Sequence, residues 1–280
     1  MRVLVTGVKG QLGFDVCKHL QARNITNKGV DLEDFDLTDQ HGTFNAITAY
    51  APDVIVHCAA YTAVDKAETN QEVCRRVNLD GTRHVALAAK HLNAKMIYIS
   101  TDYVFNGQGT LPFEVDAPID PQNVYGITKA LGEAEVRAIL DKFFIVRISW
   151  AFGANGNNFI KTVMRLGVEK DSVNVVNDQI GSPTYTEDLA PLLCDMLQTE
   201  RYGTYHATNE GYCSWYEFAK LIMSEAKLTC KVNPITTHEY PTPAKRPFNS
   251  RLSKESLDKA GFHRLPAWQD AVKRYIALCR

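Results

Sequence analysis

Short apolar runs alternate with longer segments of helical period over the first half of the chain. The runs are rich in Val and Ile, which is typical of strands buried on both faces; they span Arg2–Thr6, Asp53–Cys58, Lys95–Ser100 and Phe143–Ile148. The intervening segments predict helices at Gln11–Ala22, Gln40–Tyr50, Asn70–Asn93 and Tyr125–Leu140. This β-α-β-α order predicts an α/β fold, a doubly wound parallel sheet (Rossmann-like) with helices on both faces.

The second strand has the weakest pattern. The segment Asn24–Asp31 contains two aliphatic residues, Ile25 and Val30. A doubly wound sheet nevertheless requires a strand between the first two helices, so we place one around Ile25–Val30.

The regular alternation of apolar runs and helical segments ends after Ser149. A Gly/Asn-rich loop spans Ala154–Asn158, and three prolines fall within Tyr240–Pro247. Helices are expected at Glu187–Gln198 and Trp215–Ala226, with a short strand near Gly203–Ala207. We predict a dinucleotide-binding domain at residues 1–150, with a later contribution from about 185–208, and a smaller C-terminal substrate-binding lobe formed mainly by 151–184 and 209–280.

Composition narrows the class of protein. The 280 residues carry 31 Lys and Arg against 32 Asp and Glu, so no broad basic surface for nucleic acid or anionic membrane is expected. The first apolar run is too short for a signal peptide, and none approaches the ~20 residues of a membrane-spanning helix. The seven cysteines are scattered and form no CxxC pair. We expect a soluble, cytoplasmic protein with no nucleic-acid or membrane partner.

The first strand leads into the glycine-rich turn Thr6–Gly13, which has the spacing GxxGxxG. Gly7 permits the tight turn, Gly10 lets backbone N–H groups approach a pyrophosphate, and Gly13 lets the helix pack on the strand. A purely structural turn is the alternative. A carboxylate about 20 residues further on is expected at the adenosine ribose, and Asp31 lies at that position, although it could be a solvated loop charge.

A second candidate site combines a tyrosine and a lysine. Tyr125 and Lys129 stand at i and i+4, on one face of a helix that follows Pro121. Proton transfer near neutral pH requires a lowered tyrosine pKa, which a nearby ammonium and an oxidised nicotinamide could supply. A surface Tyr/Lys pair is the alternative, but the strand ending in Ser100-Thr101-Asp102 places hydroxyls and a carboxylate where such a sheet binds its ligands.

These motifs together resemble the extended short-chain dehydrogenase/reductases, and within them the dTDP-4-dehydrorhamnose reductase family. The segments that carry the resemblance span nearly the whole chain: Thr6–Gly13, Cys58–Glu68, Ser100–Phe105, Asn123–Lys129, Asn157–Phe159, Asn177–Thr184 and Pro243–Leu252. STDYVF together with NDQIGSPT is more specific than the glycines or the YxxxK pair alone.

The resemblance implies reduction, with NADPH or NADH, of the 4-keto group of dTDP-6-deoxy-L-lyxo-4-hexulose to dTDP-L-rhamnose. Tyr125 would protonate the C4 alkoxide, Lys129 would bind the nicotinamide ribose and lower the pKa of the tyrosine, and Thr101 would bind the keto oxygen. The expected cofactor-binding residues are Gly7, Gly10, Gln11, Leu12, Gly13, Asp31, Asp36, Leu37, Ala60, Tyr61, Thr62, Ile99, Tyr125 and Lys129. The expected contacts of the nucleotide-sugar substrate are Thr101, Asp102, Trp150, Asn158 and Arg246.

Three of the residues in these regions have plainer alternatives. Trp150 ends a strand and could be a core residue, and Arg246 could be an ordinary surface charge. His57 lies inside a buried strand, so we expect a core histidine with its hydrogen bonds satisfied rather than a ligand.

The chain departs from the family in one respect. Some members bind magnesium through glutamates at a dimer interface, whereas the matching positions here carry Asp15, Glu187 and Ala277. Magnesium therefore stays open on the resemblance alone, we assign no metal ligands, and a homodimer also stays open. Two other functions also stay open: a nucleotide-sugar epimerase or dehydratase of the same superfamily, and a non-catalytic regulatory subunit related to the reductase.

The choice between the two cofactors depends on the segment after the second strand. Asn27–Asp39 holds five acidic residues and a single base, Lys28, and Lys9 in the glycine loop is one further cation. Carboxylates there repel a 2′-phosphate, so we expect NADH to be accepted at least as well as NADPH.

Overall fold

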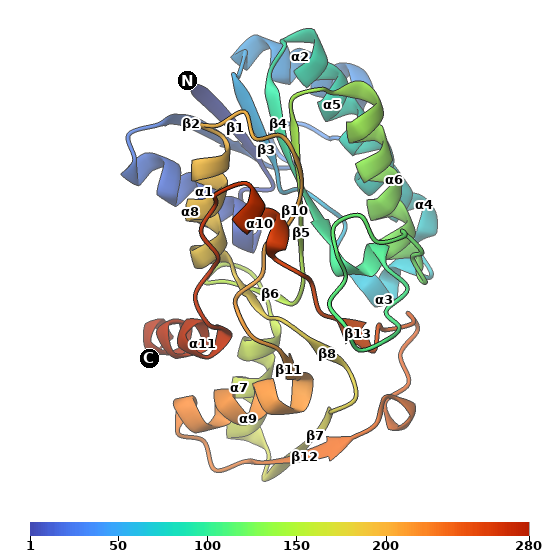
Figure 1. Cartoon of the computed structure of the whole chain (residues 1–280), viewed down its shortest axis with the longest axis vertical. Coiled ribbons are helices and arrows are strands. Elements are labelled where there is room, and N and C mark those ends of the chain that lie inside the picture. Colours follow the sequence, from blue (N-terminus) through green and yellow to red (C-terminus); the bar gives the residue numbers. More distant parts are fainter. Residues whose placement is uncertain (280) are drawn as a thin grey trace.

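A six-stranded parallel sheet forms the centre of the molecule's larger part (Figure 1). The computed structural model describes residues 1–279. The strand order is β10-β5-β4-β3-β1-β2, so the order reverses between β1 and β3. The strands are β1 (Arg2–Thr6), β2 (Thr26–Val30), β3 (Val54–His57), β4 (Lys95–Thr101), β5 (Phe143–Ile148) and β10 (Gly203–His206). Ligands of such sheets bind beyond the carboxyl ends of the strands at this reversal.

Helices cover both faces of the sheet, as Figure 1 shows. One face packs against α1 (Gln11–Ala22) and α8 (Thr186–Met196), and the other against α2 (Gln40–Tyr50), α5 (Thr82–His91) and α6 (Val124–Ile139). Successive strand residues feed the two cores alternately: Val3 and Val5 face α1 and α8, whereas Leu4 faces the opposite layer. This explains why the strands are apolar throughout.

The smaller lobe lies below the sheet in Figure 1 and has its own aromatic core. Phe152, Phe218, Trp268 and Tyr275 are buried there. Its helices are α7 (Phe159–Glu169), α9 (Trp215–Ala226) and α11 (Trp268–Leu278). Its strands form three small sheets: β12 (Lys231–Ile235) with β7 (Ser172–Val176), β6 (Ala151–Phe152) with β9 (Thr184–Tyr185), and β8 (Ile180–Gly181) between β11 (Cys213–Ser214) and β13 (Asn249–Ser250).

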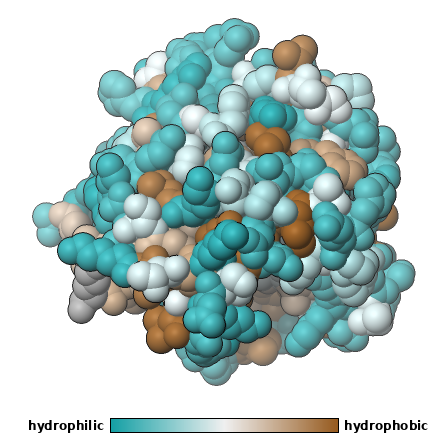
Figure 2. Space-filling model, turned by 90° about the horizontal axis from the view of Figure 1, so that it is seen from below, coloured by the Kyte–Doolittle hydropathy of each residue, from teal (hydrophilic) through white to brown (hydrophobic). Residues whose placement is uncertain are grey.

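Seen from below, polar residues cover most of the surface of this end of the molecule (Figure 2). Apolar residues show between them in separate small groups. Within residues 1–279, no helix is both long and apolar enough to cross a bilayer.

The predicted fold class is confirmed, and the weak second strand is present as β2. One predicted helix differs: Asn70–Asn93 contains α4 (Gln71–Arg75), a π-helical turn (Arg76–Gly81) and then α5. The short helices α3 (Val64–Ala67) and α10 (Glu255–Lys259) were not predicted, and neither were α7 and α11.

The C-terminal segment returns to the larger part of the molecule. Leu257 of α10, Phe262 and Leu265 are buried in the core that α1 and α8 share with the sheet. Residues 255–265 therefore pack on the sheet, although the sequence places them mainly in the second lobe. The exact boundaries of the two parts stay a prediction.

Candidate active site

The turn after β1 has the backbone geometry that a pyrophosphate requires. Gly7 adopts φ +71°, and a Cβ there would lie 2.7 Å from the backbone nitrogen of Ala59. A Cβ on Gly13 would clash with the Gly7 carbonyl oxygen. Gly10 caps α1 without a side chain, so the first N–H groups of the helix face open space. The cradle fits the diphosphate of a dinucleotide.

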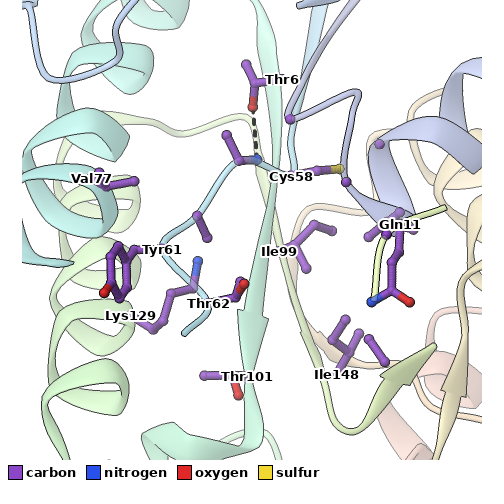
Figure 3. A pocket seen from close by; sticks show the side chains of 18 of the residues that line it. Thr6, Gln11, Cys58, Tyr61, Thr62, Val77, Ile99, Thr101, Lys129 and Ile148 are labelled. Atoms are coloured by element: carbon purple, nitrogen blue, oxygen red, sulfur yellow. Dashed lines mark hydrogen bonds between the residues drawn. The ribbon is translucent and has the colours of Figure 1, made fainter. Parts of the chain in front are cut away.

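A cavity of about 750 Å³ runs from this turn to the cleft between the two lobes. Figure 3 shows Gln11 of α1 and Lys129 of α6 entering it from opposite sides, with Thr101 at the end of β4 between them. Most of the predicted site residues line it: Gly7, Gly10, Gln11, Leu12, Gly13, Asp31, Asp36, Leu37, Ala60, Tyr61, Thr62, Ile99, Thr101, Asp102, Tyr125, Lys129 and Trp150. The structure thus brings together residues from six separate segments.

The carboxyl end of β4 presents a hydroxyl and a carboxylate to the cavity. The Thr101 hydroxyl donates to Asp102 Oδ1 at 2.9 Å and accepts from the Tyr103 N–H at 3.2 Å. Asp102 Oδ2 and the nearby Ser250 hydroxyl are both buried, and among residues 1–279 neither forms a hydrogen bond of good geometry. Burial raises the pKa of Asp102 to about 6, although the hydroxyls of Ser250 and Thr101 oppose the shift. An unpartnered buried oxygen beside a cavity is suited to accept a bond from a ligand.

Tyr125 and Lys129 lie on the first two turns of α6. The Asn123 side chain caps this helix by accepting from the Gly126 N–H at 2.8 Å, and Tyr125 on its first turn lines the cavity together with Thr101 and Asp102. Burial, followed by the Asp102 charge, raises the pKa of Tyr125. The expected lowering by Lys129 is therefore not seen in the structure, and Tyr125 retains its proton near neutral pH, as an acid requires.

The Lys129 ammonium is withdrawn from water. Its Nζ lies 4.0 Å from the centre of the Tyr98 ring, a cation–π geometry. Burial lowers the pKa of Lys129 to about 7, and the Glu133 carboxylate one turn further along α6 opposes this. The ammonium is thus held at the floor of the cavity and titrates close to neutral pH.

Asn78, which the sequence analysis missed, fixes one wall of the cavity. Its side chain accepts from the Tyr61 N–H at 2.8 Å and donates to the Tyr61 carbonyl and to the Thr128 hydroxyl, both at 3.1 Å. Asn78 lies in the π-helical turn, and such turns often occur at functional sites. One amide therefore ties the loop after β3 to the residue before Lys129.

The predicted substrate contacts fall into two groups. Trp150 lines the cavity with φ +49°, and its ring stacks on Trp215 with centroids 3.7 Å apart. Asn158 and Arg246 lie outside the lining. Asn158 caps α7 and donates to Gln11 Oε1 and Gly153 O, whereas Arg246 donates to the Tyr103 hydroxyl and pairs with Asp65. Both side chains hold neighbours of the cavity, and a direct contact with substrate stays a prediction.

His57 is a core histidine, as expected. It is 1% exposed, and its two ring nitrogens lie 2.7 Å and 3.2 Å from the hydroxyls of Thr6 and Thr82. Burial, with Lys129 nearby, lowers its pKa to about 3, so it stays neutral.

Two of the positions that the family resemblance linked to magnesium are engaged with protein groups. Asp15 accepts a hydrogen bond from the Thr186 hydroxyl, and Glu187 pairs with Lys18 at 2.8 Å. In the described part of the chain, no group of three His, Cys, Asp or Glu side chains could hold a metal ion.

Comparison with known proteins gives the family. The family model described as "RmlD substrate binding domain" matches residues 1–280. The spore coat polysaccharide biosynthesis protein SpsK of Bacillus subtilis is 39% identical over 275 residues, which cover 98% of this chain and 96% of that protein.

Two solved structures are similar over the whole molecule. A dTDP-4-dehydrorhamnose reductase of Clostridium acetobutylicum superposes with a TM-score of 0.98 at 39% identity, covering 100% of this chain and 99% of the other. The Bacillus anthracis reductase in complex with NADP has a TM-score of 0.96 at 40% identity and covers 99% of both chains. The chain therefore belongs to the RmlD family, that of the dTDP-4-dehydrorhamnose reductases.

Proposed function

We propose that this protein is an NAD(P)H-dependent oxidoreductase of dTDP-rhamnose biosynthesis, which reduces the 4-keto group of dTDP-6-deoxy-L-lyxo-4-hexulose to give dTDP-L-rhamnose. The observation that carries the proposal is the meeting of Thr101, Tyr125 and Lys129 at one end of a cavity whose other end is a pyrophosphate cradle. Relatives at 39–40% identity that bear the name of this reductase support it.

The chain's own residues account for the proton and for orientation. The reduced nicotinamide supplies the hydride for C4 when it is bound. Tyr125, protonated because burial raises its pKa, donates its proton to the C4 oxygen as negative charge develops there. The Thr101 hydroxyl turns from Asp102 toward the same oxygen. The Lys129 ammonium, which lines the same end of the cavity, would hold the hydroxyls of the nicotinamide ribose.

Substrate recognition falls to the cleft between the lobes. Asp102 Oδ2 accepts a bond from a sugar hydroxyl, and the indole of Trp150 provides a flat apolar wall. Asn158 and Arg246 complete the proposed set, acting through Gln11 and Tyr103 respectively.

We also propose that the protein is cytoplasmic and forms a homodimer. All seven cysteines are unpaired, which supports a reducing compartment such as the cytoplasm. A homodimer is proposed from the family resemblance alone.

One assay tests the reaction. The 4-keto sugar nucleotide is generated enzymatically in the cuvette, and oxidation of NADH or NADPH is followed by the loss of nicotinamide absorbance. Stoichiometric oxidation with formation of dTDP-L-rhamnose is expected. A tightly retained cofactor without net oxidation would identify an epimerase or dehydratase instead, and the absence of any turnover would favour a regulatory subunit.

A further inference from the structure

The side chain of Lys9 is a cation that lies among acidic residues at the adenosine end of the cavity. Of all the residues that line the cavity in the described part of the chain, Lys9 and Lys129 are the only Lys or Arg side chains. Lys129 belongs to the catalytic end. Lys9 lies in the glycine turn, beside Asp31 and Leu32, which follow β2. Lys9 is thus the one side chain in this lining able to pair with a phosphate on the adenosine ribose.

The carboxylate of Asp31 is fixed where the glycine turn meets the turn after β2. Its Oδ2 accepts from the Lys9 N–H and its Oδ1 from the Leu32 N–H, both at 2.9 Å. The Asp31 N–H in turn donates to Asp34 Oδ2 at 2.8 Å. A carboxylate held at this position accepts bonds from the 2′- and 3′-hydroxyls of a ribose and repels a 2′-phosphate.

The side chain of Lys9 is already paired. Its Nζ lies 2.5 Å from Glu33 Oε1, and the two side chains are 65% and 67% exposed. The backbone of Lys9 is held at both polar atoms, since its N–H donates to Asp31 and its carbonyl accepts from Asn155 Nδ2 at 2.7 Å. Only the side chain is therefore free to change partner.

We propose that the Lys9–Glu33 pair sets the choice between NADH and NADPH. While Glu33 holds Lys9, the adenosine end of the cavity presents the carboxylate of Asp31, with Asp34 bonded to the Asp31 backbone, and favours a ribose with free hydroxyls. A 2′-phosphate binds only when Lys9 leaves Glu33 for the phosphate. The inference rests on the proposed function only in requiring a nicotinamide dinucleotide in the cavity.

Direct binding tests the inference without any sugar substrate. NADH and NADPH are titrated into the purified protein, and nicotinamide fluorescence gives both dissociation constants. Wild type is expected to bind NADH at least as tightly as NADPH. Glu33→Gln releases Lys9 and removes one like charge, so NADPH affinity should rise about fivefold, with a smaller change for NADH. Lys9→Met should weaken NADPH by about fivefold and NADH by less.

A double variant separates exchange of partners from a general loss of charge. If Lys9 is the group that Glu33 restrains, Glu33→Gln should raise NADPH affinity far less in a Lys9→Met background than in wild type. Equal gains in the two backgrounds would overturn the proposal, because Glu33 would then act on the phosphate without Lys9.

Glu255→Gln is the matched control. It breaks another exposed pair, Lys259–Glu255 at 3.1 Å, whose members do not line the cavity, and it should leave both affinities unchanged. An effect of Glu255→Gln as large as that of Glu33→Gln, or equal effects of Glu33→Gln on both cofactors, would overturn the inference.

Failure of wild type to bind either cofactor would overturn the inference together with the proposed function. A selective shift in binding with no turnover of the 4-keto sugar would leave the inference standing and remove only the proposed reaction.

Discussion

At the adenosine end of the cavity the charged side chains lie in water, whereas at the catalytic end they are buried. Lys9 and Glu33 are about two-thirds exposed. Asp102 and Lys129 are 3% and 2% exposed. The same kinds of charge therefore act in two dielectric environments within one cavity.

Because of this difference in burial, we expect the adenosine end to affect cofactor affinity and the catalytic end to affect the reaction itself. Exposed pairs contribute little to stability and are screened by salt, so the adenosine end can tune affinity at small cost to the fold. Burial shifts the pKa values of the charged groups at the catalytic end, so these groups can exchange protons near neutral pH. The same burial lowers the free energy of unfolding of the protein. We expect variants at the catalytic end to have large, pH-dependent effects and variants at the adenosine end to have small, salt-dependent ones.

The largest effect is expected for Tyr125→Phe. The change removes only the hydroxyl that donates the proton, so kcat should fall by about 10²-fold or more, while the dissociation constant of the cofactor changes little. Steady-state kinetics and a cofactor titration measure both. Tyr103→Phe is the control. The Tyr103 ring lies edge-on to that of Tyr125, but its hydroxyl accepts a hydrogen bond from Arg246. This variant should lower kcat much less than Tyr125→Phe. Near-normal turnover of Tyr125→Phe would remove it as the acid.

Lys129→Met should lower activity and raise stability together. Without the ammonium, kcat/KM should fall by about tenfold or more. The decline of activity expected for wild type above about pH 7, where Lys129 loses its proton, should be absent from the variant. The folded pKa of about 7 lies below the usual 10.5, so the unfolded chain binds the proton more tightly. The folding cost is therefore greatest below pH 7 and fades as the pH rises toward the unfolded value.

Thermal unfolding checks the stability part of this prediction. Lys129→Met should be more stable than wild type at pH 6 by at least about 1 kcal/mol, with a Tm higher by a few degrees, and the gain should shrink at pH 9. Lys90→Met, in an exposed pair with Asp141, should show no such gain. A variant that is inactive but no more stable at pH 6 would contradict the burial of a charged Lys129.

Asp102→Asn should act on the sugar rather than on the cofactor. The amide retains the shape but loses the charge that accepts a sugar hydroxyl, so KM for the sugar nucleotide should rise about tenfold with cofactor binding unchanged. In wild type the same KM should rise as the pH falls through about 6, because the carboxyl then takes up its proton. A KM that stays flat from pH 5 to 8 in both proteins would show that Asp102 does not contact the substrate.

Much of the larger part of the molecule could be predicted from sequence because its signals are local. β1 and β4 are continuous apolar runs, and the glycines at 7, 10 and 13 each meet a steric need of the turn. Their place in a doubly wound sheet then brings Thr101 and Tyr125 to one cavity. The two-residue strands β6, β8 and β9 of the second lobe are too short to show any periodicity, so they could not be predicted.

The electrostatics of the site could not be read from sequence either. The pKa values of Asp102, Tyr125 and Lys129 depend on burial, which is set by packing from several elements. The role of Asn78 depends on a π-helical turn inside what the periodicity indicates is one long helix. The pairing of Lys9 with Glu33 joins two turns 24 residues apart.

The smallest effect, and the one that separates the two ends, is the response to salt. Raising the ionic strength from about 0.1 M to about 1 M shortens the Debye length from about 10 Å to about 3 Å. The repulsion of a 2′-phosphate by Asp31, Glu33 and Asp34 should weaken, so the ratio of NADPH to NADH affinity should rise about twofold. Glu33→Gln leaves a smaller net charge at the rim and should show a smaller change in this ratio. The kcat with saturating NADH should move little over the same range, because Lys129 and Asp102 are shielded from the added ions. If salt altered kcat strongly and left the affinity ratio unchanged, the contrast between an exposed selective end and a buried catalytic end would be wrong.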